Sequence, residues 1–190
     1  MSADQDTKAN RQASRRLAQI LGKLIALILI VALVVLIERY CQVAVSPFGP
    51  DAHIVVVDGD SLRADDGVEY RLFGIDAPEL HQNCNEVNGK PWQCGRAAKV
   101  KLTALINRGD VNCEAQAKDR FGRIVAVCRA KGVPDISEAM VRDGYAIGLA
   151  FARGNYQEAQ DEAEAAKRGI WRGSFERPAE WRAANPRVGD

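Results

Sequence analysis

The residues best suited to chemistry in this sequence are carboxylates and an arginine grouped in one short stretch. Asp60 follows an apolar run, and Arg71, Asp76 and Glu79 come after it. Two aspartates supply the oxygen ligands that a hard cation prefers, with calcium the first choice and magnesium its rival. A guanidinium can hold two phosphate oxygens at once, and a carboxylate beside bound water can act as a base. These residue types indicate phosphodiester hydrolysis, in which negative charge builds up on the oxygens around phosphorus.

A β-hairpin is expected to bring these groups together. Asp66 and Gly67 give a strong signal for a two-residue turn, because glycine takes positive φ without strain. With these two residues as the turn, Leu62 faces Arg71 across the hairpin. Strand alternation then puts Asp60 and Arg71 on one face.

Three sequence motifs, taken in order, resemble the thermonuclease (staphylococcal-nuclease-like) family. They are DGDS at residues 58–61, RLFGIDAPE at residues 71–79 and DRFGR at residues 119–123. The resemblance covers residues 52–183, and three motifs in the family's order are more specific than any one of them. It implies an α+β fold, a five-stranded OB-fold β-barrel with about three helices packed on it.

The resemblance also implies a calcium site. Asp60 and Asp76 would bind Ca²⁺ through their carboxylates, and Ala77 through its backbone carbonyl. The family often carries threonine where this chain has Ala77. Because the implied ligand at that position is a main-chain oxygen, the change of side chain leaves the ligand in place.

The same resemblance implies three catalytic residues, Arg71, Glu79 and Arg123. The two arginines would hold the scissile phosphate, and Glu79 would orient or deprotonate the attacking water. The predicted function is a calcium-dependent nuclease that hydrolyses DNA, RNA or both by metal-assisted attack of water. One alternative is a non-catalytic OB-fold domain that binds nucleic acid or protein, and another is a structural protein of an envelope complex. The complete set of site residues argues against the binding domain, which has no need for it, and the structural protein would be favoured if metal affected neither the fold nor any activity.

The N-terminal region has the composition of a membrane anchor. Residues 1–40 carry a net charge of +3, which leaves −2 for the rest of the chain. The polar residues 1–16 are expected to be a disordered cytoplasmic tail, and the mostly apolar residues 17–37 are long enough to form a transmembrane helix. The positive charge before this helix puts the N-terminus in the cytoplasm and the following domain outside the inner (plasma) membrane, in a periplasmic or extracellular position.

A cleaved signal peptide is the rival interpretation of the same segment. The only Ala-x-Ser pattern nearby, at residues 44–46, is followed by Pro47 and makes a poor cleavage site. We therefore predict a retained anchor, a linker over residues 38–51, the nuclease domain over residues 52–183 and a tail over residues 184–190. The predicted partners are a DNA or RNA substrate and the membrane, with no dedicated protein partner evident.

One pair of cysteines is predicted from strand register. Strands over residues 111–118 and 123–130 flank the connection at residues 119–122, and this register puts Cys113 directly opposite Cys128. Opposed residues of antiparallel strands have Cα separations of about 4.5–5.5 Å, which a disulfide tolerates. The predicted disulfide is therefore Cys113–Cys128.

A second disulfide is predicted in the long loop that holds His81, Cys84 and Cys94. A Cys84–Cys94 bond competes there with a zinc site that would include His81. The disulfide is favoured, because a tetrahedral zinc site needs a fourth ligand and closer cysteines. Two disulfides fit an oxidising compartment, and Cys41 remains as a free thiol or an intermolecular link.

Helical periodicity predicts three helices in the domain. The first covers residues 96–107, with Val100 among its inward positions, and the second begins with Asp135 or Ser137 as its cap. The third covers residues 156–168, and glycine follows it. The chain beyond the third helix is expected to pack only briefly before it frays.

Overall fold

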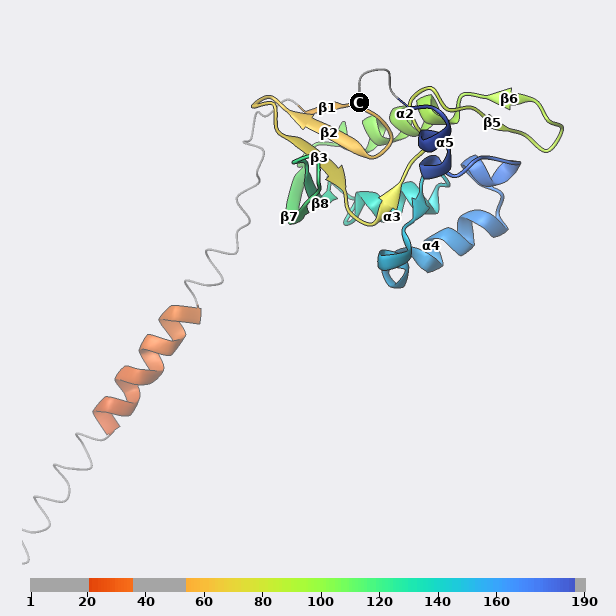
Figure 1. Ribbon diagram of the computed structural model, residues 1–190. Coiled ribbons are helices and arrows are strands. Elements are labelled where there is room, and N and C mark those ends of the chain that lie inside the picture. The colour runs from red at the N-terminus through yellow and green to blue at the C-terminus, as the bar shows by residue number, and fades with distance from the viewer. Residues whose placement is uncertain (1–20, 36–53, 187–190) are drawn as a thin grey trace, which may run out of the picture. The chain divides into compact units, whose positions relative to one another are not determined.

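The computed structural model describes residues 21–35 and 54–186 of the chain, which divides into two units, Met1–Val45 and Ser46–Asp190. In the first unit, residues 21–35 form a helix whose side chains are all exposed (Figure 1). No helix within the described ranges is long and apolar enough to cross a membrane. The predicted tail at residues 1–16, both ends of the predicted span at residues 17–37 and the linker at residues 38–51 lie outside those ranges.

The second unit is an α+β fold built on a five-stranded sheet (Figure 1). In spatial order the strands are β1 (Ile54–Val56), β2 (Ser61–Ala64), β3 (Glu69–Leu72), β8 (Ile124–Arg129) and β7 (Asn112–Lys118). Neighbouring strands are antiparallel except β3 and β8, which run parallel. Two short pairs are added, β4 (Ile75–Asp76) with β9 (Ile147–Gly148) and β5 (Cys84–Asn85) with β6 (Pro91–Trp92).

The sheet is open, which corrects the prediction of a closed barrel. Strands β1 and β7 are its two edges, and no ladder among the described residues joins them. Strand β1 has only three residues, and α2 (Cys94–Ile106) packs against it. The five strands and their order remain consistent with an OB-like fold.

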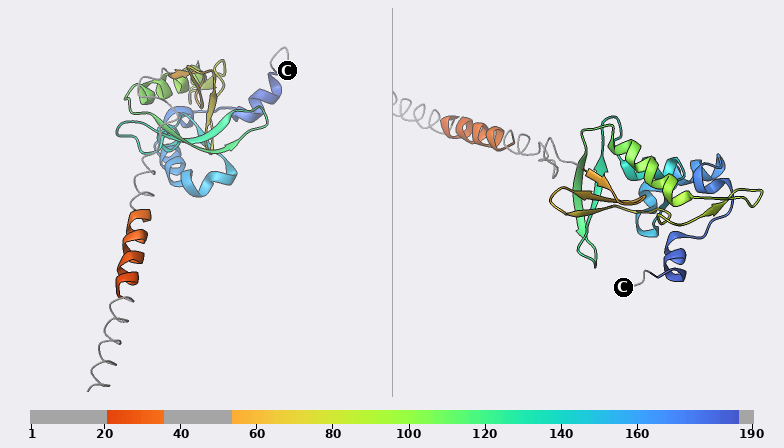
Figure 2. Two further views of the ribbon diagram at one scale, coloured as in Figure 1. Left: turned by 90° about the vertical axis from the view of Figure 1, so that its left-hand side faces the viewer. Right: turned by 90° about the horizontal axis from the view of Figure 1, so that it is seen from above.

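Most of the helices lie together beside the sheet, and the C-terminal one lies apart from them (Figure 2). Besides α2 they are α3 (Ile136–Arg142), α4 (Arg153–Ala165) and α5 (Pro178–Ala184), with short 3₁₀ turns η1 (Ala150–Ala152) and η2 (Gly169–Arg172). Helix α2 packs on β1, α3 packs on β8, and α4 packs on α3. The three predicted helices are present with shifted ends, whereas α5 was not predicted.

Of two detailed predictions about the helices, the N-cap of α3 is confirmed and the inward position of Val100 in α2 is wrong. Asp135 is the N-cap of α3, because its side chain accepts a hydrogen bond from the Glu138 N–H at 3.2 Å. In α2 the inward stripe runs through Ala98, Leu102 and Leu105. The prediction that Val100 faces inward is wrong, because it lies on the opposite side of that stripe and is 68% exposed.

The first hairpin has a register one residue away from the predicted one. Arg71 lies opposite Ser61 rather than Leu62. The Ala64 N–H donates to the Val68 carbonyl at 3.0 Å, so the loop holds three residues and ends in Gly67 at a φ of 82°. A glycine in this conformation closes the common three-residue hairpin loop, in which the last residue forms a bulge.

The second hairpin uses the same kind of loop, yet its cysteines still face each other. The Asp119 N–H donates to the Arg123 carbonyl at 3.0 Å, so the pairing beside the turn is shifted by one residue from the prediction. A bulge between Ala115 and Ala117 reverses this shift further along β7. Cys113 therefore pairs with Cys128 across the ladder, as predicted.

Both predicted disulfides are confirmed. Cys113–Cys128 joins β7 to β8 with a Cα separation of 4.0 Å, and Cys84–Cys94 joins β5 to the start of α2 with a Cα separation of 5.6 Å. The second bond removes the zinc alternative, because it uses both thiols that His81 would have needed.

Loss of the disulfide between β7 and β8 is expected to weaken the domain. The double substitution Cys113→Ser with Cys128→Ser opens a loop with a sequence separation of 15 residues. Chain entropy alone predicts a loss of about 3 kcal/mol in the free energy of unfolding, measured by urea denaturation. The matched pair of substitutions at Cys84 and Cys94, with a separation of 10 residues, should cost slightly less. Alkylation of Cys113 or Cys128 in unreduced protein would contradict the pairing.

Candidate active site

Three of the residues singled out in the sequence meet in one buried cluster at the end of the first hairpin. Arg71 Nη1 donates to Asp60 Oδ1 at 2.9 Å, and Arg71 Nη2 donates to Asp76 Oδ1 at 2.8 Å. Asp60 and Asp76 are 3% and 2% exposed, and the Arg71 side chain is 18% exposed. A single guanidinium therefore bridges two carboxylates that are withdrawn from water.

The backbone around Asp60 fixes its carboxylate. Asp60 Oδ2 accepts a hydrogen bond from the Ala77 N–H at 3.0 Å, and Oδ1 accepts one from Ser61 Oγ at 3.0 Å. Gly59 allows this approach, because a Cβ there would lie 2.7 Å from the Cβ atoms of Ala77 and Ala98. The glycine of the DGDS motif is thus needed to pack the β1–β2 connection against β4 and α2.

Glu79 joins the same cluster through an arginine that the sequence did not reveal. Arg182, on α5, donates from Nη1 to Asp76 Oδ1 at 3.0 Å and to Glu79 Oε1 at 2.8 Å. Its Nη2 donates to Asp76 Oδ2 at 3.1 Å. The Glu79 side chain is 15% exposed and that of Arg182 is 40% exposed, so this part of the cluster opens to solvent.

In the cluster, burial and the attraction between opposite charges act on the pKa values in opposite directions. Burial raises the pKa of the Asp60 carboxyl, although the charge of Arg71 acts in the opposite direction. Burial works to lower the pKa of Arg71, but the charges of Asp60 and Asp76 outweigh it and raise that pKa. The pKa of Arg182 is raised in the same way, against its burial, by hydrogen bonds to Asp76 and Glu79. Both guanidiniums therefore stay charged.

Arg123 lies near this cluster but not within it. It directly precedes β8, whose Val125 pairs with Arg71 of β3, so Arg123 lies at the start of the strand next to that of Arg71. Its Nε donates to Asp119 Oδ2 at 2.8 Å, and its N–H donates to Asp119 Oδ1 at 3.0 Å. Burial acts to raise the pKa of Asp119, but these bonds and one from the Phe121 N–H outweigh it and lower that pKa. Asp119 thus orients Arg123, and the structure shows no bond from Arg123 to Asp60, Asp76 or Glu79.

Arg182 and Gln82 are the site residues that sequence reasoning missed. The one available signal for α5 was Pro178, since proline is favoured at the first position of a helix. Nothing in the local sequence shows that this helix reaches Asp76, which lies 106 residues earlier. Gln82 is fully buried beneath the site and reads from the sequence as an ordinary loop residue.

The cluster contains two carboxylates of the kind that a hard cation uses, and in this structure Arg71 and Arg182 donate to their oxygens. Two buried carboxylates, Asp60 and Asp76, present oxygen ligands beside each other. In the part of the chain that the structure describes, no group of three or more His, Cys, Asp or Glu side chains could hold a metal ion. A cation here would therefore complete its shell with main-chain oxygens and water, as calcium and magnesium both can.

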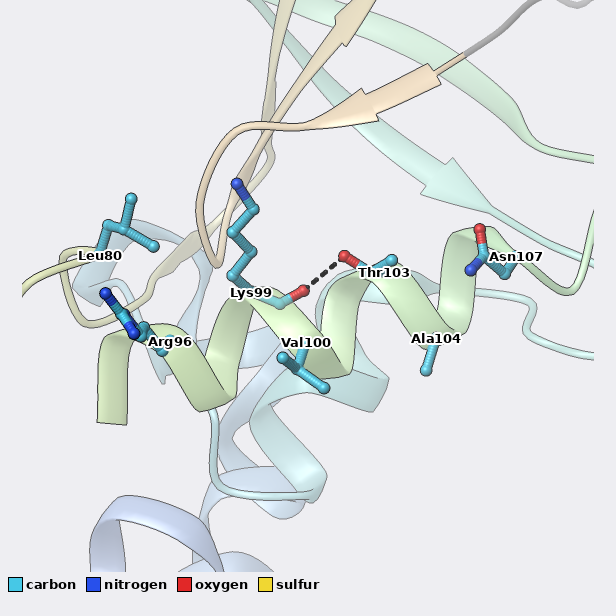
Figure 3. A pocket seen from close by; sticks show the side chains of 7 residues that line it. All are labelled: Leu80, Arg96, Lys99, Val100, Thr103, Ala104 and Asn107. Atoms are coloured by element: carbon cyan, nitrogen blue, oxygen red, sulfur yellow. Dashed lines mark hydrogen bonds between the residues drawn. The ribbon is translucent and has the colours of Figure 1, made fainter. Parts of the chain in front are cut away.

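A separate cavity of about 550 Å³ runs along the exposed side of α2 (Figure 3). Its lining residues are Leu80, Arg96, Lys99, Val100, Thr103, Ala104 and Asn107. Leu80 directly follows Glu79, but none of the carboxylates of the cluster lines this cavity. In Figure 3 the Lys99 side chain points to the opposite side of α2 from the apolar Val100 and Ala104. The carboxylate cluster is the candidate site, because no Asp or Glu lines this cavity.

Comparisons with known proteins show the family of this chain and several of its relatives. A family model described as Staphylococcal nuclease homologue matches residues 69–173, more than half of the chain. The chain is 31% identical over 119 residues to "Succinoglycan biosynthesis protein ExoI" of Rhizobium meliloti (strain 1021), which covers 62% of each protein. It is 30% identical over 125 residues to an "Uncharacterized endonuclease" of Escherichia coli, covering 61% of this chain and 72% of the relative.

In a third relative the matching region is a small part of a much longer protein. "Endonuclease YhcR" of Bacillus subtilis (strain 168) is 30% identical over 146 residues, which are 67% of this chain but only 12% of that protein. The match spans less than two thirds of the length of the Bacillus and Rhizobium proteins. The family match contains Arg71, Asp76, Glu79 and Arg123, while Asp60 precedes it and Arg182 follows it. On this family match and this site, the chain belongs to the staphylococcal nuclease homologue family.

Proposed function

We propose that this chain is a calcium-dependent nuclease that hydrolyses phosphodiester bonds of DNA, RNA or both. The observation that carries the proposal is the buried bridge from Arg71 to Asp60 and Asp76, with Glu79 tied to the same Asp76 through Arg182. A purely binding OB-like domain has no use for three carboxylates at one point, because they repel the phosphates of a nucleic acid. The endonuclease names of relatives and the general calcium dependence of the family support the same proposal.

Each residue of the cluster has a proposed role in the reaction. Asp60, Asp76 and the backbone carbonyl of Ala77 would hold the cation, which when bound would stabilise negative charge on the phosphate oxygens. Arg71 and Arg123 would bind the scissile phosphate, for which the planar guanidinium offers paired donors. Glu79 would orient a water molecule and accept its proton, since its carboxylate is partly open to solvent.

The proposed location is outside the cytoplasm, attached to the membrane by residues 17–37. The basic charge before this stretch supports an N-terminus in the cytoplasm. The two disulfides support an oxidising compartment for the domain. The helix over residues 21–35 is the described part of the proposed anchor.

Removal of calcium is expected to stop cleavage. Full-length oxidised protein in detergent would be mixed with single-stranded DNA or RNA oligonucleotides, either with calcium or with a chelator. Cleavage should fall more than about tenfold in chelator, because the phosphate oxygens would lose the positive charge with which a bound cation would stabilise them. If magnesium alone restored cleavage, magnesium would replace calcium as the proposed metal. A folded protein that binds the oligonucleotide in both conditions and cuts in neither would favour the binding domain.

A further inference from the structure

We infer that the segment Gly173–Ala184, which begins at the last residue of the family match and continues beyond it, completes the active site, and that Arg182 is a positioning residue for Glu79. The inference rests on the proposed nuclease function and assigns a role within the same site. It starts from three contacts that tie this segment to the loop after Glu79. The contacts involve main chain, a buried side chain and the Arg182 guanidinium in turn.

The first contact is between backbones. The Asn85 N–H donates to the Ser174 carbonyl at 2.8 Å. A Cβ on Gly173 would lie 2.0 Å from the Asn85 carbonyl oxygen, so the two segments touch without room for a side chain. The start of the C-terminal segment is thus fixed against the strand that carries Cys84, which the disulfide anchors to α2.

The second contact passes through Gln82, which is 0% exposed. Its Nε2 donates to the Glu176 carbonyl at 2.7 Å, and its Oε1 accepts from the Glu79 N–H at 3.1 Å. Its own N–H donates to the Glu79 carbonyl at 2.8 Å. All of these polar groups are paired, so Gln82 transmits the position of the C-terminal segment to the main chain of Glu79.

The third contact fixes the Glu79 carboxylate itself. Asp76 and Glu79 carry like charges and would repel each other in this partly buried place. Arg182 Nη1 donates to both carboxylates, at 3.0 and 2.8 Å, while Nη2 gives Asp76 a second bond. The guanidinium therefore sets the Glu79 carboxylate at a fixed place relative to Asp76, a proposed cation ligand. Its rigid fork makes this possible, because the two η nitrogens lie in one plane.

Helix α5 cannot supply this arginine without the other two contacts. It has seven residues, and helices of that length are unstable alone in water. The contacts at Ser174 and Glu176 hold the chain that enters α5, and Pro178 at its first turn is buried. The position of Arg182 is thus a consequence of how the C-terminal segment docks.

The test compares Arg182→Gln with Arg182→Lys and with Arg177→Gln in the full-length oxidised protein. Arg177 is an exposed arginine at the start of α5, so its substitution removes the same charge without touching the cluster. Arg182→Gln is expected to lower kcat on a single-stranded oligonucleotide about 10- to 100-fold, with KM nearly unchanged. Arg182→Lys should recover part of the lost kcat, and Arg177→Gln should behave as wild type.

A second readout does not depend on activity. In Arg182→Gln the amides of residues 79–82 should exchange hydrogen faster than in wild type or in Arg177→Gln, because their segment loses one of its anchors. Wild-type kcat in Arg182→Gln would overturn the inference, and a higher kcat would show that Arg182 blocks the site instead. If wild-type protein cuts no substrate, the proposed function fails, and the exchange rates alone decide whether α5 braces this loop.

Discussion

Replacement of Glu79 by glutamine is expected to slow cleavage of single-stranded DNA or RNA about 100- to 10,000-fold, the usual contribution of a general base. Glutamine has the size of glutamate and can still accept the bond that Arg182 donates to Oε1 at 2.8 Å. It cannot take a proton from water, so the chemical step loses its base while the cluster stays assembled. The rate would be measured with a saturating fluorescent oligonucleotide in calcium, so that the comparison reports kcat.

A matched substitution separates this effect from a general change of charge. Glu158 lies exposed on α4, and Glu158→Gln removes the same charge away from the site. That variant should cut at the wild-type rate, and both variants should unfold at nearly the same urea concentration as wild type. A rate for Glu79→Gln equal to that of Glu158→Gln would mean that another group activates the water.

Replacement of Arg71 by methionine is expected to lower the free energy of unfolding by about 3–5 kcal/mol at neutral pH. The substitution keeps the apolar stem but removes the guanidinium that pairs with Asp60. Asp76 then has only the ion pair with Arg182. A buried carboxylate that has lost its opposite charge costs far more than the pair contributes when intact. Urea denaturation followed by tryptophan fluorescence would measure the loss.

The same hairpin contains a control for Arg71. Arg63 pairs with Glu69 at 2.6 Å, but their side chains are 50% and 39% exposed. Arg63→Met should change the free energy of unfolding by less than about 1 kcal/mol, since water screens such a pair. Arg71→Lys should be intermediate, because one ammonium cannot bridge two carboxylates as a guanidinium does. If Arg71→Met and Arg63→Met lowered the free energy of unfolding by the same amount, burial would not strengthen the contribution of the Arg71 bridge.

The sequence was sufficient to select most of the site because the motif residues are close in the chain. Asp60, Arg71 and Asp76 come from one hairpin and the strand after it, so they are close in space as well as in sequence. The predicted register was wrong by one residue, but Asp60 lies just before β2 and the long Arg71 side chain still reaches it. The Cys113–Cys128 pair was predicted correctly for a partly different reason, since a bulge offsets the shift made by the turn.

The tertiary structure alone decided three further features. The sheet stays open, because the pairing of its edges depends on how the short β1 lies relative to β7 and α2, and no local pattern expresses that. Arg123 lies just before β8, the strand that pairs with the strand of Arg71, and Asp119 holds it outside the carboxylate cluster. Arg182 enters the cluster from the far end of the chain.

The sequence by itself therefore determined the residue types of the chemistry, the two disulfides and the hairpin that carries Asp60 and Arg71. Turn signals and strand alternation act over a few residues, and this range covers the hairpin that carries Asp60 and Arg71. The contact between Arg182 and Asp76 spans 106 residues and exists only once α5 has docked. That docking depends on the packing of Gly173 against Asn85 and on the buried bonds of Gln82, which arise only when the chain is folded.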